Sequence, residues 1–172
     1  MSAKIKKYPG EALESKEIRE GRVPTEKFRP KAKFAWSAGV AMSRFLEELK
    51  NGKIIASTCS KCGRVIVPPR IYCEKCYTST DGWRYVKDTG TINTFSVPFL
   101  AADATRLKEP EIVAIINLDG ASEDMGIIHK IGDVKDWKTV KIGMRVKAVW
   151  KTPKERTGAI TDIKHFKPVK EE

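Results

Sequence analysis

Apolar residues follow a helical spacing before residue 53 of this chain and a strand-like spacing after it. Between Ser37 and Gly52, apolar residues recur at positions i, i+3, i+4 and i+7, which is typical of a helix with one buried face. This stripe consists of Met42, Phe45, Leu46 and Leu49. Ser37 is a suitable N-cap, and Gly52 stands where a glycine commonly follows the last helical residue. The sequence therefore predicts a helix of about three turns that packs against another part of the fold.

After residue 53 the apolar residues come in short runs, separated by turn dipeptides such as Asp119-Gly120 and Thr157-Gly158. Strands are expected at Lys53–Ser57, Trp83–Asp88, Thr91–Val97, Ile112–Leu118, Gly126–Ile131, Arg145–Lys151 and Ile160–Phe166. The runs after residue 82 favour a small closed antiparallel barrel of the OB type over a β-sandwich. Two longer loops, Leu100–Pro110 and Asp133–Val140, are expected to carry the binding residues of such a barrel.

Residues 1–36 have a different pattern. Three prolines interrupt this segment, charged residues are frequent, and only Glu11–Glu20 has the pattern of one or two helical turns, ended by Gly21. The segment contains too few apolar residues to fold alone. We expect an arm that lies along a partner or along its own domain, with simple disorder as the alternative.

All four cysteines lie in two C-x-x-C pairs, Cys59/Cys62 and Cys73/Cys76, with ten residues between the pairs. Gly63 follows the first pair and lets the backbone curl beneath the sulfurs. Two such turns deliver four soft thiolates to one divalent ion, so the sequence predicts a zinc ribbon with all four cysteines as ligands. Four thiolates complete the coordination shell, which leaves no position for water or substrate and makes the metal structural.

Disulfides, a redox pair and iron are the alternatives to zinc for these cysteines. Two disulfides would require an oxidising compartment, but no apolar signal segment follows Met1. A thioredoxin-type redox pair fits poorly, because the motif occurs twice and lacks a βαβ setting. Tetrahedral iron is compatible with the same four ligands. Structural zinc is favoured over these alternatives.

The chain is basic, with 33 Lys and Arg against 22 Asp and Glu and a formal net charge of +11. The excess is spread along the sequence. It suits an anionic partner: nucleic acid, a phosphorylated cofactor or an acidic subunit. A solvated surface explains part of this charge without any partner. No apolar run is long enough to cross a membrane, and we expect a soluble, cytoplasmic protein.

Several motifs occur in a recognisable order. They are Phe45-Leu-x-x-Leu-x-x-Gly52, Cys59-x-x-Cys-Gly63, Pro68-Pro-Arg70, Cys73-x-x-Cys76, Gly90-Thr-Ile-x-x-Phe95, Pro98-Phe99, Ile142-Gly-Met-Arg-Val146 and Phe166-Lys-Pro168. This order resembles the zinc-ribbon and OB-fold family formerly called domain of unknown function 35. The resemblance implies a mainly β fold. An N-terminal helical arm (1–52) would precede a rubredoxin-like zinc ribbon (53–82) and a small antiparallel OB-fold barrel (83–172).

Members of this family are typically partners of thiolase-superfamily enzymes. Some bridge an acetoacetyl-CoA thiolase and a hydroxymethylglutaryl-CoA synthase and help to form a shared coenzyme A channel. The resemblance therefore implies a non-catalytic accessory or scaffold subunit of a thiolase-type acyl-CoA complex. Its implied partners are thiolase-superfamily subunits in a hetero-oligomer, together with a coenzyme A thioester. The alternative is an accessory subunit of a degradative thiolase or of an acyl-CoA hydratase.

The residues agree with a role that is not catalytic on its own. A thiolase requires a free nucleophilic cysteine and a histidine base. Here all four cysteines are expected to be metal ligands, and the only histidines are His129 and His165. We interpret both histidines as packed or surface residues. Since no G-x-S-x-G, H-E-x-x-H or glycine-rich phosphate loop occurs, we assign no catalytic residue.

Ribbons and OB barrels also bind nucleic acids, which is the second hypothesis. Single strands bind OB surfaces through stacking aromatics and basic residues on strands two and three. The runs Gly90–Val97 and Glu111–Leu118, taken as these strands, contain no basic residue and only one aromatic, Phe95. Nucleic acid is therefore the less favoured partner.

Coenzyme A requires a few positive groups for its nucleotide and a narrow apolar passage for its pantetheine arm. The candidates are Arg70, after the Pro-Pro turn, and Phe99, Arg106 and Lys108 in the loop after Val97. A purely structural role is the alternative for each candidate. Arg70 would brace the ribbon against the barrel, and the loop charges would be solvated.

Overall fold

The structure is a computed structural model. It describes residues 14–22, 35–101, 104–123 and 125–169. The chain divides into two units, Met1–Trp36 and Ser37–Glu172, and each is described by itself.

The described part of the first unit contains one short helix, α2 (Ser15–Arg19). Glu14 is its N-cap, and Gly21 follows it with a left-handed backbone at φ +69°. The expected helical turn and its glycine end are therefore present. Residues 11–13 and the three prolines of the predicted arm lie outside the described residues.

Helix α3 (Gly39–Lys50) is the helix that the apolar stripe predicts. Its C-terminal end is a Schellman motif. The Gly52 N–H donates to Leu49 O at 2.9 Å, and the Lys53 N–H donates to Glu48 O at 2.9 Å. Gly52 has φ +74°, a conformation that glycine adopts without strain. The predicted glycine end of the helix is confirmed.

The predicted N-cap of α3 is wrong by one residue. Ala38 holds the N-cap position without a side-chain hydrogen bond, and the Ser37 hydroxyl accepts from the Gly39 N–H at 3.3 Å. The helix buries Phe45 and Leu49 almost completely. Among the described residues, no helix has the length and apolar character that a membrane crossing requires.

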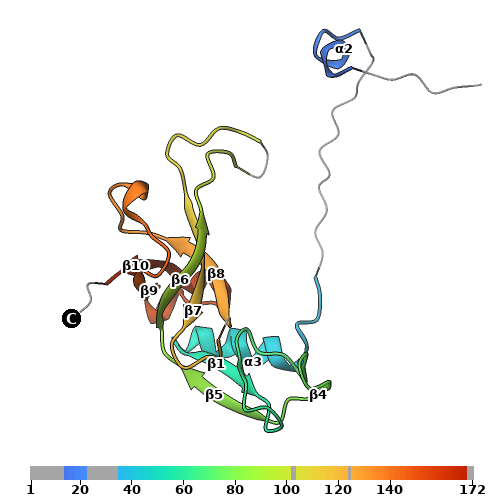
Figure 1. The fold of residues 1–172 in the computed structure, drawn as a ribbon, viewed down its shortest axis with the longest axis vertical. Coiled ribbons are helices and arrows are strands. Elements are labelled where there is room, and N and C mark those ends of the chain that lie inside the picture. Colours follow the sequence, from blue (N-terminus) through green and yellow to red (C-terminus); the bar gives the residue numbers. More distant parts are fainter. Residues whose placement is uncertain (1–13, 23–34, 102–103, 124, 170–172) are drawn as a thin grey trace, which may run out of the picture. The chain divides into compact units, whose positions relative to one another are not determined.

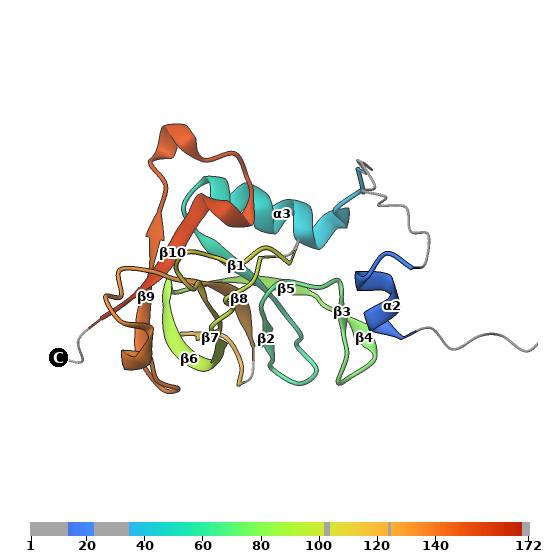
Figure 2. The ribbon, with the colours of Figure 1, turned by 90° about the horizontal axis from the view of Figure 1, so that it is seen from above.

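The ribbon strands form two small sheets (Figure 2). One has the order β2 (Val65–Ile66), β1 (Ile54–Thr58), β5 (Gly82–Val86), and the other pairs β3 (Tyr72–Cys73) with β4 (Thr78–Ser79). The strand expected at Trp83–Asp88 therefore forms in part, but it pairs antiparallel with β1. It extends the sheet of the ribbon and is not a strand of the barrel.

The barrel is closed by five strands in the order β10-β8-β7-β6-β9 (Figure 1). They are β6 (Thr89–Ser96), β7 (Ile112–Leu118), β8 (Gly126–Ile131), β9 (Arg145–Trp150) and β10 (Ile163–Pro168). Neighbouring strands are antiparallel except β8 and β10, which run parallel with Phe166 opposite Ile131. The structure confirms the mainly β fold with a closed barrel of the OB type, and it adds this one parallel pair.

Short 3-10 helices occupy the connections: η1 (Trp137–Thr139), η2 (Pro153–Glu155) and η3 (Ile160–Asp162). The last strand is predicted to begin at Ile160, but β10 begins at Ile163. The reason is Asp162, whose carboxylate accepts hydrogen bonds from the backbone N–H groups of residues 157–159. These bonds fold the chain back on itself where the pattern predicts an extended strand.

Two apolar clusters hold the second unit together. The larger one joins α3, β1 and the barrel, and it includes Phe45, Ile54, Ile116 and Phe166. Fully burying such side chains stabilises a fold by about 1.5–3 kcal/mol each. The smaller cluster consists of the buried residues Cys59, Ile66 and Cys73, with partly buried neighbours. The cysteine end of the ribbon therefore has a small cluster of its own, whereas β1 of the ribbon packs into the larger cluster.

An ion pair on the barrel gives a prediction about acid stability. Arg145 Nη1 donates to Asp119 Oδ1 at 2.8 Å, Nη2 bonds the other carboxylate oxygen, and the Thr89 hydroxyl also donates to it. The Arg145 hydrogen bonds are the main cause that lowers the pKa of Asp119 to about 2, while burial acts in the opposite direction. Because this pKa is lower in the folded chain than in the unfolded one, the pair stabilises the fold above the ordinary carboxyl pKa.

We therefore expect the free energy of unfolding to fall as the pH drops from about 4 to about 2, where Asp119 becomes protonated. The variant Asp119→Asn should lack this part of the decline. Urea unfolding at several pH values measures both slopes. Equal slopes for the two proteins would contradict the prediction.

Candidate functional site

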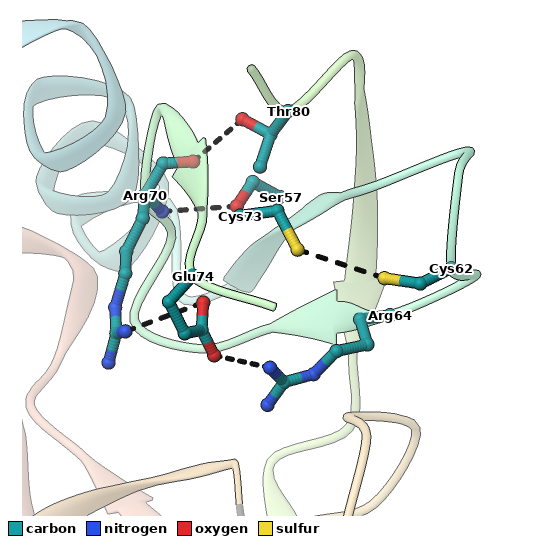
Figure 3. Close-up of polar contacts among 7 residues, drawn as sticks. All are labelled: Ser57, Cys62, Arg64, Arg70, Cys73, Glu74 and Thr80. Carbon is teal, nitrogen blue, oxygen red and sulfur yellow. Dashed lines mark hydrogen bonds and ion pairs between the residues drawn. The ribbon is translucent and has the colours of Figure 1, made fainter. Parts of the chain in front are cut away.

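The four cysteine Sγ atoms lie within 4.8 Å of one another in the ribbon. Cys62 Sγ and Cys73 Sγ are 3.7 Å apart (Figure 3). A tetrahedral zinc ion with Zn–S bonds of about 2.3 Å separates its sulfur ligands by about 3.8 Å. A disulfide bond requires about 2.05 Å between sulfurs, and all four cysteines are free. The structure thus brings the predicted ligands together at a spacing that fits a metal ion.

The same backbone turn holds both C-x-x-C pairs. The Gly63 N–H donates to Cys59 O at 2.8 Å, and the Tyr77 N–H donates to Cys73 O at 2.9 Å. Both residues have a left-handed backbone, with φ 70° at Gly63 and 54° at Tyr77. Tyr77 therefore takes the place in the second turn that glycine takes in the first. No sequence signal marks Tyr77 for this place, because residues with a Cβ rarely adopt this conformation.

Residues outside the two pairs fix the first turn. The Asp81 carboxylate accepts from the Ser60 N–H at 3.0 Å and from the Ser60 hydroxyl. These bonds lower the pKa of Asp81. Thr78 Oγ1 lies 3.9 Å from Cys59 Sγ, within reach of a weak hydrogen bond to the sulfur. Sequence reasoning missed the role of Asp81, because the Asp81-Gly82 pair signals only a turn.

Glu74 connects the two halves of the ribbon (Figure 3). Its carboxylate pairs with Arg64 on one side and lies 3.6 Å from Arg70 Nη1 on the other. The Arg70 backbone is held as well, since its N–H donates to Ser57 Oγ at 3.0 Å and its carbonyl accepts from Thr80 Oγ1 at 2.7 Å. Arg70 thus braces the ribbon internally, while about half of its side chain stays exposed.

The thiols influence one another because they are close. The backbone N–H of Cys62 is the main cause that lowers the pKa of Cys59 to about 7. Hydrogen bonding to the Cys62 thiol is the main cause that raises the pKa of Cys76 to about 12. The Cys59 thiol therefore loses its proton more easily than an ordinary thiol and the Cys76 thiol less easily, because the neighbouring sulfur groups stabilise the Cys59 thiolate and the protonated Cys76. A divalent ion supplies positive charge to the four sulfurs, and the donor set fits structural zinc.

The structure separates the candidate residues for coenzyme A. Arg70 lies in the ribbon, whereas Phe99, Arg106 and Lys108 lie in the loop between β6 and β7, which extends away from the ribbon in Figure 1. The Phe99 ring is half exposed and meets Trp137 edge to face, with 6.1 Å between ring centroids. Arg106 and Lys108 are exposed. The role of all four residues toward coenzyme A stays a prediction.

Both histidines lie in the barrel and away from the cysteines. The His129 ring packs against Phe166 with 5.7 Å between centroids, and burial lowers the pKa of His129. The Lys130 N–H donates to His129 Nδ1 at 2.9 Å, so the proton is on Nε2, which lies 3.2 Å from Ile160 O. His165 lies on β10 and is partly buried. His129 is therefore a packed residue whose ring nitrogens are both engaged.

The barrel topology changes which two strands would form the nucleic-acid-binding surface of an OB fold. Because β5 belongs to the ribbon sheet, the second and third strands of the OB barrel are β7 and β8, and the expected pair was placed one strand too early. Strand β8 adds Lys130, which pairs with Glu111. Neither strand contains Phe, Trp or Tyr. The corrected pair still lacks the aromatic platform on which single strands stack.

Two family models match the chain in the same order as its two folded parts. Residues 46–81 match the ChsH2 rubredoxin-like zinc ribbon domain, and residues 83–151 match the ChsH2 C-terminal OB-fold domain. The boundary between the two matches falls within β5. Among curated proteins, no relative matches.

Two solved structures resemble the chain. A DUF35-family protein of unknown function from Sulfolobus solfataricus is 29% identical, with a TM-score of 0.55, over 64% of this chain and 78% of its own. A chain of the structure described as "Ltp2-ChsH2(DUF35) aldolase" is 17% identical, with a TM-score of 0.55, over 81% of this chain and 98% of its own. The second likeness shows the fold alone. With its four-cysteine ribbon, its OB barrel and both family matches, this chain belongs to the zinc-ribbon and OB-fold family DUF35.

Proposed function

We propose that this chain is a non-catalytic accessory subunit of a thiolase-type acyl-CoA complex, in which it binds the catalytic subunit and helps to enclose the coenzyme A thioester. The observation that carries the proposal is the match of both parts of the chain, in order, to the two ChsH2 domains. A ChsH2 chain of this fold is named together with Ltp2 in an aldolase. Thiolases and aldolases both make or break carbon–carbon bonds, which suits a partner of that class.

The described residues do not bring a cysteine and a histidine together. His165 Nε2 lies 3.2 Å from a carboxylate oxygen of Asp133 and not beside a nucleophile of the metal site. All four cysteines gather in the metal centre, where a bound ion would occupy their sulfurs. His129 is engaged through both ring nitrogens. A nucleophile with an adjacent base is what covalent acyl transfer requires. We therefore assign the chemistry to the partner subunit and the shaping of the site to this chain.

The β6–β7 loop is the stronger candidate for contact with coenzyme A. It offers Arg106 and Lys108 as cations for phosphate groups and the Phe99–Trp137 pair as an apolar wall for pantetheine. Arg70 is a weaker candidate, because Glu74 already lies 3.6 Å from its guanidinium. A bridge between an acetoacetyl-CoA thiolase and a hydroxymethylglutaryl-CoA synthase is the most specific form of the proposal.

Affinity capture from a native extract tests the proposal. We expect the tagged full-length chain to retain a thiolase-superfamily subunit in near-stoichiometric amount, identified by mass spectrometry. The acyl-CoA activity of that subunit should rise when the chain is added to it. Two different enzymes in one complex would support the bridging form. Recovery of the chain without any thiolase-type subunit, under conditions that preserve complexes, would count decisively against the function.

A further inference from the structure

The outer face of the barrel is apolar where β7 and β8 lie side by side. Along β7 the residues alternate between the core and the outside, so Val113 and Ile115 face outward. On β8 the exposed residues are Ile128 and Lys130, and Ile128, which is 66% exposed, pairs directly with Ile115. Outward positions of a barrel in water are usually polar. Here an exposed strip of branched apolar residues replaces them.

Three hollows meet at Ile128. One of about 560 Å³ runs over Ile128 and Ile160 of η3, one of about 240 Å³ lies over Val113 and Ile115, and one of about 340 Å³ reaches Leu46 of α3. All three are lined in part by Ile128. The strip therefore continues from the barrel onto the helix as one grooved surface. A contiguous exposed apolar surface is characteristic of a site of protein association.

Lysines border the largest hollow. Lys130, Lys151 and Lys164 line it, and among the described residues no acidic side chain lines any of the three hollows. Lys130 pairs with Glu111. Lys151 and Lys164 form no close ion pair with another described residue, and the carboxylate that both influence is that of Glu155. The surface therefore combines an apolar floor with a positive border.

These features select among possible occupants. The closed barrel offers no free strand edge here, so a partner must bind through its side chains and not by adding a strand. A second copy of this basic chain would bring the same lysine border against itself, which electrostatic repulsion disfavours. A segment with apolar side chains flanked by Asp or Glu satisfies both the floor and the border.

We propose that this grooved face, centred on Ile128 and bordered by Lys130, Lys151 and Lys164, is the surface on which the thiolase-type subunit docks through an apolar segment flanked by acidic residues. The inference rests on the function proposed above and adds the location of the interface. Ile128 is its central apolar contact, and the lysines guide the approach of the acidic partner.

The test uses the full-length chain and the thiolase-type subunit captured with it, purified and immobilised. Ile128→Asp should weaken binding at least about tenfold, because it places a carboxylate in the apolar centre. Ile142 is 67% exposed and lines none of the three hollows, so Ile142→Asp is a matched control. This control should change the dissociation constant less than about twofold. Circular dichroism checks that both variants fold.

A second variant tests the same surface without changing Ile128, so the result does not depend on how the barrel tolerates a substitution there. Reversal of both charges, Lys151→Glu with Lys164→Glu, should slow association at least about threefold at low salt and reduce its salt dependence, and circular dichroism checks the fold of this variant as well. If Ile128→Asp and the charge variant both bind like wild type, the docking surface is wrong while the accessory function stands. Self-association that Ile128→Asp abolishes, with partner binding unchanged, would also overturn it. If the wild-type chain captures no thiolase-type subunit, both proposals fail.

Discussion

Replacing Cys62 by serine is expected to reduce the metal content from about one ion per chain to nearly none and to unfold the ribbon. A serine hydroxyl is a poor substitute for a thiolate, and the three remaining sulfurs lie too close together to be stable as anions without the ion. The smaller apolar cluster of Cys59, Ile66 and Cys73 would lose the ion that joins two of its members to Cys62 and Cys76. For sites of this kind, the free energy of metal binding is part of the free energy of folding.

The barrel should survive this change. Its core belongs to the larger cluster, which includes Ile116 and Phe166 and no cysteine, and to which β1 of the ribbon also contributes. Metal analysis and amide hydrogen exchange measure the two effects together. The amides of β3 and β4 should exchange rapidly, whereas those of β7 and β8 should stay protected. Lys61→Ala is the control, because Lys61 lies between two ligands without being one. An unchanged zinc content in Cys62→Ser would refute the assignment of the centre.

Removing the carboxylate of Asp162 is expected to destabilise the fold strongly. Asp162 is fully buried, and it accepts hydrogen bonds from Thr157 N at 3.0 Å, Gly158 N at 2.7 Å and Ala159 N at 3.1 Å. Burial by itself opposes ionisation, but these bonds outweigh it and lower the pKa of Asp162. In Asp162→Ala the three N–H groups lose their acceptor. We expect the free energy of unfolding to fall by about 3 kcal/mol.

Urea unfolding at neutral pH measures this loss. Thr161→Ala is the matched control, because Thr161 is the exposed neighbour of Asp162, and it should change the free energy by less than about 0.5 kcal/mol. A lowered pKa stabilises the fold above the ordinary carboxyl range, so acid should remove the advantage of the wild type. The difference between wild type and Asp162→Ala should therefore narrow below about pH 4. A loss no larger than that of Thr161→Ala would show that solvent replaces the missing oxygens.

The parts of the fold that depend on local periodicity could be predicted from the sequence. The apolar stripe through Phe45 and Leu49 located α3, and apolar runs marked β7 and β8 with the bounds that the structure shows. The clustering of the four cysteines could be predicted from their spacing, because two C-x-x-C turns bring four sulfurs together in almost any ribbon. Each of these features is determined by a pattern that spans only a short stretch of sequence.

The parts that depend on distant contacts could not be predicted. Nothing in the residues of β5 indicates that it pairs with β1, since a strand pattern does not name its neighbour. The sequence pattern places Asp162 in a strand, because its three N–H partners are visible only after the chain has turned back. Ile128 resembles any other strand residue in the sequence, since an apolar run looks the same whether its alternate side chains face a core or a partner.

The parallel pairing of β10 with β8 also determines the order in which the chain can fold during synthesis. Phe166 meets Ile131 across this pair, so the barrel cannot close before Phe166 has emerged from the ribosome. The ribbon sheet is complete by Val86, well before the first contact between β8 and β10 can form. A nascent chain can therefore acquire its metal while the barrel strands are still emerging, with the folded ribbon and α3 ready to receive them.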